Sequence, residues 1–189
     1  MSSRDTLNIG KIHNGADDNA SGVAGMLELA KHYATNSVQE PFNFLCIAFG
    51  AEELGLLGSK HFVEKPTIPL SSIHWMLNFD MIGRYQVENG LAIIGHGTSS
   101  KFPEIVDKIE SDIRFYGSKD GNGGSDQTSF YRKNIPVLFF HTGGHPDYHG
   151  SGDDEEKINY KAMNSILKIA KEVIDNSMKF EEMDFVWTN

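Results

Sequence analysis

The chain has 189 residues, of which 39% are hydrophobic and 23% charged, and this predicts a single domain over residues 1–189 with an apolar core of its own. Its formal net charge is −9 and its lysines and arginines form no cluster, which disfavours nucleic acid as a partner. No run of about 18 apolar residues is present, so the sequence predicts no membrane span.

The first regular pattern is helical and runs from Ala20 to Ala34. Asn19 or Ser21 can cap its start, because short polar side chains accept hydrogen bonds from the free N–H groups of a first turn. The apolar residues recur at helical spacing and predict one buried stripe, made of Val23, Met26, Leu27, Ala30 and Ala34.

Three extended segments follow. Phe42–Gly50 is apolar on both alternations, which predicts a central strand covered on both faces. Cys46, the single cysteine, lies within this segment and is expected to be a small buried core residue. Ile73–Met81 and Leu91–Gly95 are predicted to be further strands.

The second half of the chain repeats this alternation. A helix is predicted at Phe102–Ile113, a loop at Gly117–Gly124 and a second central strand at Ile135–His141. A long C-terminal helix is predicted from the spacing of Met163, Ile166, Leu167, Ala170, Val173 and Ile174. Strands that alternate with helices indicate an α/β fold, with helices packed on a largely parallel or mixed sheet.

Two polar clusters precede predicted helices, where open α/β sheets often place their sites. The first is GADDNASG at residues 15–22, in which Asp17, Asp18 and Asn19 either cap the helix or supply ligands. The second contains the adjacent Glu52 and Glu53. Their side chains point in different directions, so one can bind a metal ion while the other faces the attacking water; alternatively, both are first-turn acids of a helix.

Two more clusters follow predicted strands. Asp80 ends an apolar segment, and its carboxylate there needs either a metal ion or an ion pair with a residue such as Arg84. HTGGHPDYHG contains His141, His145 and His149, but its glycines and proline oppose a helix, so the three rings need not converge. Each histidine is either a ligand or an ordinary hydrogen-bonded side chain.

The four clusters together supply several carboxylates and at least one imidazole, with no serine or cysteine in a recognisable nucleophile turn. Carboxylate oxygens combined with neutral imidazole suit Zn²⁺ or a similar divalent ion. The residues therefore predict metal-assisted hydrolysis without naming the bond that is cut.

Five motifs together resemble those of the co-catalytic zinc aminopeptidase family, which includes aminopeptidase Y and bacterial leucyl aminopeptidases. They are, in order, GADDNASG, AEELGLLGS, LNFDMIG, SDQTSFYRKNIPVLFF and HPDYH, and the likeness runs from Ile12 to the C-terminal helix. The resemblance implies a three-layer α/β/α sandwich with a mixed, mostly parallel sheet. It also implies peptide substrates with a free N-terminus.

The resemblance assigns the zinc ligands by position. Asp18 bridges two zinc ions, Glu53 and His149 complete one site, and Asp80 belongs to the other. The family's second zinc also takes a histidine from an upstream H-x-D segment, which is absent from Met1–Asn14. The resemblance therefore implies a chain that lacks the family's N-terminal strands and binds one zinc ion well and a second weakly or not at all.

By the same resemblance Glu52 is the general base, Tyr148 steadies the oxyanion and Asp17 supports Asp18. Three alternatives stay open: a metallocarboxypeptidase, a glutaminyl cyclase-like enzyme of the same fold, or a non-catalytic binding domain. Related enzymes are often exported, so the resemblance is compatible with a secreted or periplasmic protein. The sequence leaves the oligomeric state open.

Overall fold

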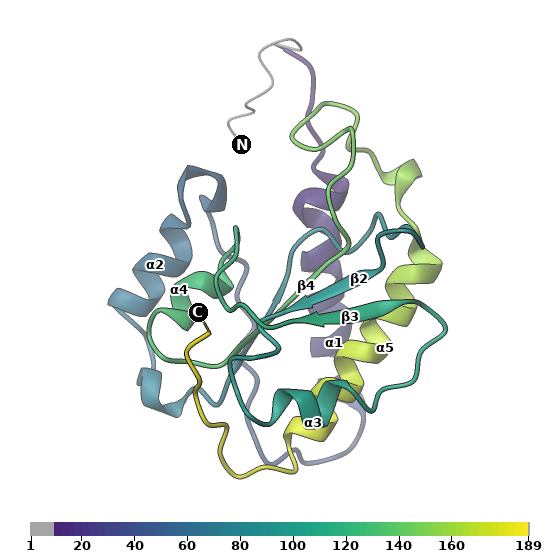
Figure 1. The fold of residues 1–189 in the computed structure, drawn as a ribbon. Helices are drawn as coiled ribbons and strands as arrows, with labels where there is room; N and C mark the ends of the chain where they lie inside the picture. Colours follow the sequence, from purple (N-terminus) through teal and green to yellow (C-terminus); the bar gives the residue numbers. More distant parts are fainter. Residues whose placement is uncertain (1–9, 189) are drawn as a thin grey trace.

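The structure, a computed structural model, describes residues 10–188, so the domain expected over residues 1–189 extends beyond the described part at both ends. A four-stranded sheet forms the centre, with α1, α3 and α5 on one face and α2 and α4 on the other (Figure 1). This arrangement confirms the predicted α/β class. Within the described residues no helix is both long and apolar enough to cross a bilayer.

The helices and strands are short apart from the first and last helices. Residues 10–188 contain the α-helices α1 Gly22–Thr35, α2 Leu57–Glu64, α3 Phe102–Val106, α4 Gln127–Tyr131 and α5 Tyr160–Ser177. The four strands are β1 Met76–Phe79, β2 Leu91–Ile94, β3 Phe115–Ser118 and β4 Val137–His141. Single helical turns lie at Ala16–Ser21, Glu52–Leu54, Leu70–Ser72 and Glu155–Lys157.

The sheet is mixed, as expected. Its strand order is β1-β4-β2-β3, with β1 parallel to β4 and β2 parallel to β3. The antiparallel pair is β2 and β4, where Ile93 lies opposite Phe140. Because β1 and β4 are parallel and Phe79 is in register with Phe140, the residues that follow both strands emerge at the same end of the sheet.

The core lies on both faces of β4, whose side chains alternate between them. Leu138 and Phe140 pack into a large cluster with α1, α3 and α5. Val137 packs on the other side with Phe130 of α4 and Val63 of α2. The predicted stripe of the C-terminal helix is confirmed: of its six residues Leu167 is partly buried and the others are buried.

The helix expected over residues 20–34 is confirmed as α1, and the Asn19 side chain caps it by accepting a hydrogen bond from the Gly22 N–H at 3.0 Å. Its buried stripe is not the predicted one, because Val23 and Leu27 are exposed. The buried positions are Gly22, Gly25, Leu29 and Tyr33. Small residues let the helix approach its neighbours closely, and a reading based on hydrophobicity alone misses this.

The prediction of a central strand at Phe42–Gly50 is wrong. The segment forms neither helix nor strand, Phe44 and Leu45 are 44% and 54% exposed, and Cys46 is exposed instead of buried. Its rings touch the domain, since Phe44 stacks on Tyr33. No backbone hydrogen bond joins residues 42–49 to the rest of the described chain, however, and a strand requires such bonds.

Several predicted elements are shorter in the structure, because turns interrupt the apolar patterns. Strand β1 covers four residues of Ile73–Met81, and α3 covers five residues of Phe102–Ile113. The loop expected at Gly117–Gly124 begins inside β3, which pairs through Gly117 and Ser118 with β2. Neither β3 nor α4 was predicted, since their sequences are short and mostly polar.

Candidate metal centre

Four segments that are distant in sequence meet beyond the ends of β1 and β4. They are the turn that precedes α1, the turn that contains Glu52 and Glu53, Asp80 after β1, and the loop after β4 that carries His149. Helix α1 starts directly against the end of β1, because Gly22 has no side chain. A Cβ there would collide with the Phe79 carbonyl oxygen and with the Asn19 side chain.

Three of the expected ligands come together. One ligand atom each from Asp18, Glu53 and His149 lies within 4.8 Å of the others. The His149 Nε2 atom is 2.9 Å from Glu53 Oε1 and 3.3 Å from Asp18 Oδ2, but it makes no hydrogen bond of acceptable geometry. This arrangement leaves an imidazole nitrogen facing two carboxylate oxygens.

The backbone in two of these segments is unusual. His149 and Ala51, the residue before Glu52, have positive φ angles of 58° each, a region that residues with side chains rarely adopt. The peptide bond between Asp18 and Asn19 is cis. Strained φ angles of this kind concentrate at functional sites, where the surrounding structure holds them in place.

Asp80 lies next to the three-residue group but outside it. Its Oδ2 accepts a hydrogen bond from Ser125 Oγ at 2.6 Å, while its Oδ1 is buried without a partner. The alternative of an ion pair with Arg84 is not realised, because Arg84 pairs with Asp147 at 3.1 Å. Asp80 therefore has one buried oxygen available to a cation.

The site gathers several partly buried carboxyl groups close to one another, and this raises their pKa values. Burial, together with the neighbouring charges of Asp80 and Glu53, raises the pKa of Asp18 to about 7. Burial likewise raises the pKa of Glu52 to about 7, assisted by Asp80 and Asp126. The pKa of Asp80 is also raised, chiefly by burial. A bound cation would favour the ionised form of each group.

Tyr148 lies at the open side of the group. Its ring stacks on the His149 ring, with 3.7 Å between the centroids, and the side chain is half exposed. Burial and then the charge of Asp18 raise its pKa, so the phenol keeps its proton and can donate a hydrogen bond at neutral pH.

Sequence reasoning missed three buried polar residues around the group. Ser125 and Asp126 lie in the motif SDQTSF, which was noted only as a likeness. Asp153 begins the acidic run DDEE, which reads as solvated surface, yet it is 2% exposed and bonds to the backbone at Asp17 and Asp18. No signal in the sequence separates Asp153 from the exposed acids that follow it.

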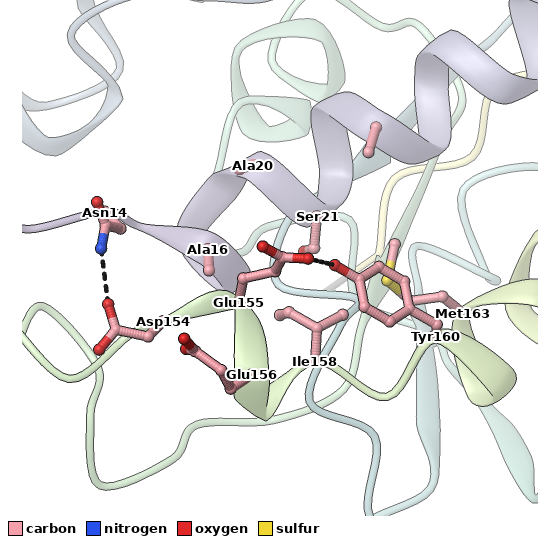
Figure 2. Close-up of a pocket in the computed structure, with 11 residues that line it drawn as sticks. Asn14, Ala16, Ala20, Ser21, Asp154, Glu155, Glu156, Ile158, Tyr160 and Met163 are labelled. Atoms are coloured by element: carbon pink, nitrogen blue, oxygen red, sulfur yellow. Dashed lines mark hydrogen bonds between the residues drawn. The ribbon is translucent and has the colours of Figure 1, made fainter.

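A separate cavity of about 500 Å³ lies on the other side of the turn that precedes α1 (Figure 2). Its rim carries a hydrogen bond of 2.7 Å from Asn14 to Asp154 and one of 3.0 Å from Tyr160 to Glu155. None of the expected ligands lines this cavity, so it is not the candidate metal centre.

The residues present fit a divalent ion. Three protein ligands are usual at a catalytic zinc, and carboxylate oxygens and neutral imidazole are ligands that zinc accepts. An ion held by Asp18, Glu53 and His149 would satisfy the unsatisfied Nε2 of His149, and the buried Oδ1 of Asp80 is available to a cation beside it. Fold and site together define an α/β domain with a candidate metal centre at the carboxyl ends of β1 and β4.

The family follows from comparison with known proteins. Residues 3–174 match the sequence profile of Peptidase family M28, and the chain belongs to that family. Aminopeptidase YwaD of Bacillus subtilis is 29% identical over 180 residues, covering 89% of this chain and 39% of that protein. Leupeptin-inactivating enzyme 1 of Streptomyces exfoliatus is 33% identical over 129 residues, covering 65% and 28% respectively.

Solved structures show the same fold. The zinc aminopeptidase BSAP from Bacillus subtilis superposes with a TM-score of 0.72 at 27% identity, covering 94% of this chain and 46% of that one. The LapA aminopeptidase of Legionella pneumophila gives a TM-score of 0.76 at 24% identity, covering 90% and 48%, and shows the fold alone. The chain spans less than half the length of each of these four proteins.

Proposed function

We propose that the chain carries the metal centre of a zinc-dependent aminopeptidase, which removes the N-terminal residue of peptides. The observation that carries this proposal is the convergence of Asp18, Glu53 and His149 within 4.8 Å. Membership of Peptidase family M28 supports it, as do the names of several relatives. Asp18, Glu53 and His149 would hold one zinc ion, and Asp80 would contribute to a second.

Zinc bound here would supply Lewis acidity, which lowers the pKa of water and polarises a peptide carbonyl. Glu52 provides the proton transfers. The pKa of Glu52 is about 7 without an ion, and a bound cation favours its ionised form, which can take a proton from the attacking water and return it to the departing amine. The neighbouring Glu53 points to His149 instead, so the two adjacent carboxylates have different tasks.

Two further features suit an N-terminal substrate. The Tyr148 hydroxyl can donate a hydrogen bond to the oxyanion that forms when the carbonyl is attacked. The carboxyl groups of Glu52, Asp80 and Asp126 make the surroundings acidic, which favours the charged amino group of a peptide.

The adjacent glutamates provide the test. We expect Glu53→Ala to lose zinc and Glu52→Ala to keep it, because one glutamate is a proposed ligand and the other is not. Zinc is counted by metal analysis after dialysis, and turnover is followed with a leucine anilide beside its N-acetylated form. Glu64→Ala on α2 serves as the surface control. Equal zinc loss in both variants, or cleavage of the acetylated substrate, would contradict these roles.

A further inference from the structure

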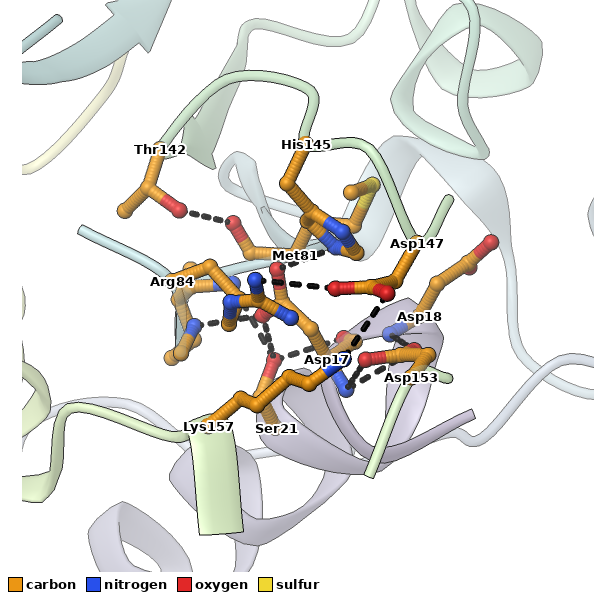
Figure 3. Close-up of polar contacts among 12 residues, drawn as sticks. Asp17, Asp18, Ser21, Met81, Arg84, Thr142, His145, Asp147, Asp153 and Lys157 are labelled. Atoms are coloured by element: carbon orange, nitrogen blue, oxygen red, sulfur yellow. Dashed lines mark hydrogen bonds and ion pairs between the residues drawn. The ribbon is translucent and has the colours of Figure 1, made fainter. Parts of the chain in front are cut away.

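The loop at residues 142–154, which we call the His149 loop, is fixed at both ends. At its start, the Thr142 N–H and Oγ1 both donate to the Met81 carbonyl, at 3.0 and 2.8 Å. At its end, the Asp153 carbonyl accepts from the Ala16 N–H at 3.1 Å. The loop is thereby tied both to the end of β1 and to the turn that carries Asp18 (Figure 3).

The Asp153 side chain strengthens the second attachment, the one to the turn that carries Asp18. Its Oδ2 accepts a hydrogen bond from the Asp18 N–H at 2.9 Å. The Asp17 N–H is shared between the two carboxylate oxygens, donating to Oδ1 at 3.0 Å and to Oδ2 at 3.1 Å. The side chain is 2% exposed, so these bonds form away from water. Asp153 follows His149 by four residues, and it holds the backbone of the Asp18 ligand.

A second buried contact attaches the loop on the other side of His149. His145 and Asp17 have side chains that are 1% and 0% exposed, and His145 Nε2 lies 3.3 Å from Asp17 Oδ2. The Asp17 side chain is itself fixed, because its Oδ1 accepts from Ser21 Oγ at 2.9 Å and from the Gly83 N–H at 2.6 Å. His145 Nε2 and Asp17 Oδ2 make no hydrogen bond of acceptable geometry, so on this side of His149 the loop packs against the turn that carries Asp18 and is bonded to it through Asp153 on the other side.

A third attachment is weaker. Asp147 pairs with Arg84 at 3.1 Å and with Lys157 at 2.8 Å. The Asp147 side chain is 24% exposed and that of Lys157 is 42% exposed, and water weakens ion pairs in such positions. The buried hydrogen bonds of Asp153 therefore fix the loop more firmly than this charged group.

We propose that Asp153 is a positioning residue that sets the separation of Asp18 and His149, and so sets the zinc affinity, without touching the ion. The buried contact between His145 and Asp17 supports the same loop from its other side. This inference rests on the proposed metal centre. Groups that orient ligands typically change metal affinity by about 10- to 100-fold when they are replaced.

Asp153 can act in two ways, and they are separable. Its negative charge attracts a cation from behind Asp18, while its hydrogen bonds fix the Asp18 backbone. In Asp153→Asn the amide oxygen can replace Oδ2 and keep the bond to the Asp18 N–H, but the charge is lost and the NH2 group takes the place of the Oδ1 that accepts from the Asp17 N–H. Asp153→Ala loses all of these bonds and the charge. Among residues 10–188 the Asp154 side chain bonds to Asn14 Nδ2 and not to the turn that carries Asp18, so Asp154→Ala is a matched control.

Zinc affinity is measured by competition with a chromogenic chelator, after thermal melting has shown that each variant is folded. We expect Asp153→Ala to weaken zinc binding by at least about tenfold, within the range for ligand-orienting groups. Asp153→Asn should recover part of that loss, because it keeps the bond to the Asp18 N–H, and Asp154→Ala should match the wild type. Wild-type affinity in Asp153→Ala, or an equal loss in Asp154→Ala, would overturn the proposal.

Hydrogen exchange of the zinc-free chain gives a readout that needs neither metal nor turnover. We expect Asp153→Ala to accelerate exchange in peptides that cover residues 16–19 and 145–150, with α5 unchanged, because the attachment between the two segments is lost. Unchanged exchange in both segments would overturn the positioning role. A wild-type chain that binds no zinc would instead contradict the proposed metal centre, so the two failures are distinguishable.

Discussion

At the scale of single residues, the centre is dominated by carboxyl groups that raise one another's pKa. Asp18 and Glu52 both reach a pKa of about 7, and Asp80 shifts in the same direction. Burial is the first cause in each case, and the like charge of the other acids adds to it. The folded chain therefore holds protons here that an unfolded chain would release, and a divalent cation competes with those protons.

The raised pKa values predict how the stability of the zinc-free chain depends on pH. The pKa of Asp18 and Glu52 lies above the unfolded value of about 4, so the folded state binds more protons between about pH 4 and 7. We expect the Tm of the zinc-free chain to fall as the pH rises through this window. Calorimetry of the wild type and of the double variant Asp18→Asn, Glu52→Gln checks it. The same slope in both proteins would refute this origin.

At the scale of secondary-structure elements, the apolar patterns predicted α1, β1, β2, β4 and α5, because each buries a face against the sheet. The apolar pattern gave a wrong prediction where strand formation depends on hydrogen bonding to a neighbouring strand. Phe42–Gly50 has the composition of a buried strand, but strand formation also needs neighbouring backbone, which composition cannot report. Four ligand candidates could be named from motif resemblance, and three of them converge. Asp153 could not be named, since only the tertiary fold separates it from the exposed acids beside it.

The exposed state of Phe42–Gly50 predicts how its cysteine reacts. Cys46 is the single cysteine and is exposed, so we expect a maleimide to modify one site per chain under native conditions. The rate should approach that of the chain in denaturant, because no packing shields the thiol. Mass spectrometry gives the extent, with Cys46→Ser as the unlabelled control. Labelling that required denaturant would restore the original prediction of a buried core residue.

At the scale of the whole molecule, a zinc ion would join parts of the chain that are distant in sequence. Asp18 precedes α1, Glu53 precedes α2 and His149 follows β4, so the centre connects both faces of the sheet at one end. An ion that binds the folded state alone stabilises it by mass action. Folding and metal binding are therefore coupled in this chain.

This coupling predicts a measurable stabilisation. Zinc at 100 times its Kd should add about 2.7 kcal/mol to the free energy of unfolding. For a chain of this length the Tm should rise by roughly 5–11 °C. Scanning calorimetry measures the rise, and a chelator should reverse it. We expect one tightly held zinc per chain, so metal analysis that found two, or an unchanged Tm, would contradict this account.

Gly22 has a consequence for how the sequence can vary. The start of α1 and the end of β1 are so close there that even a methyl group would strike the Phe79 carbonyl oxygen. Selection should therefore hold this position at glycine in every descendant that keeps both segments in place, whatever happens on the exposed face of the helix. A saturation library screened for retained zinc should return glycine codons alone at position 22.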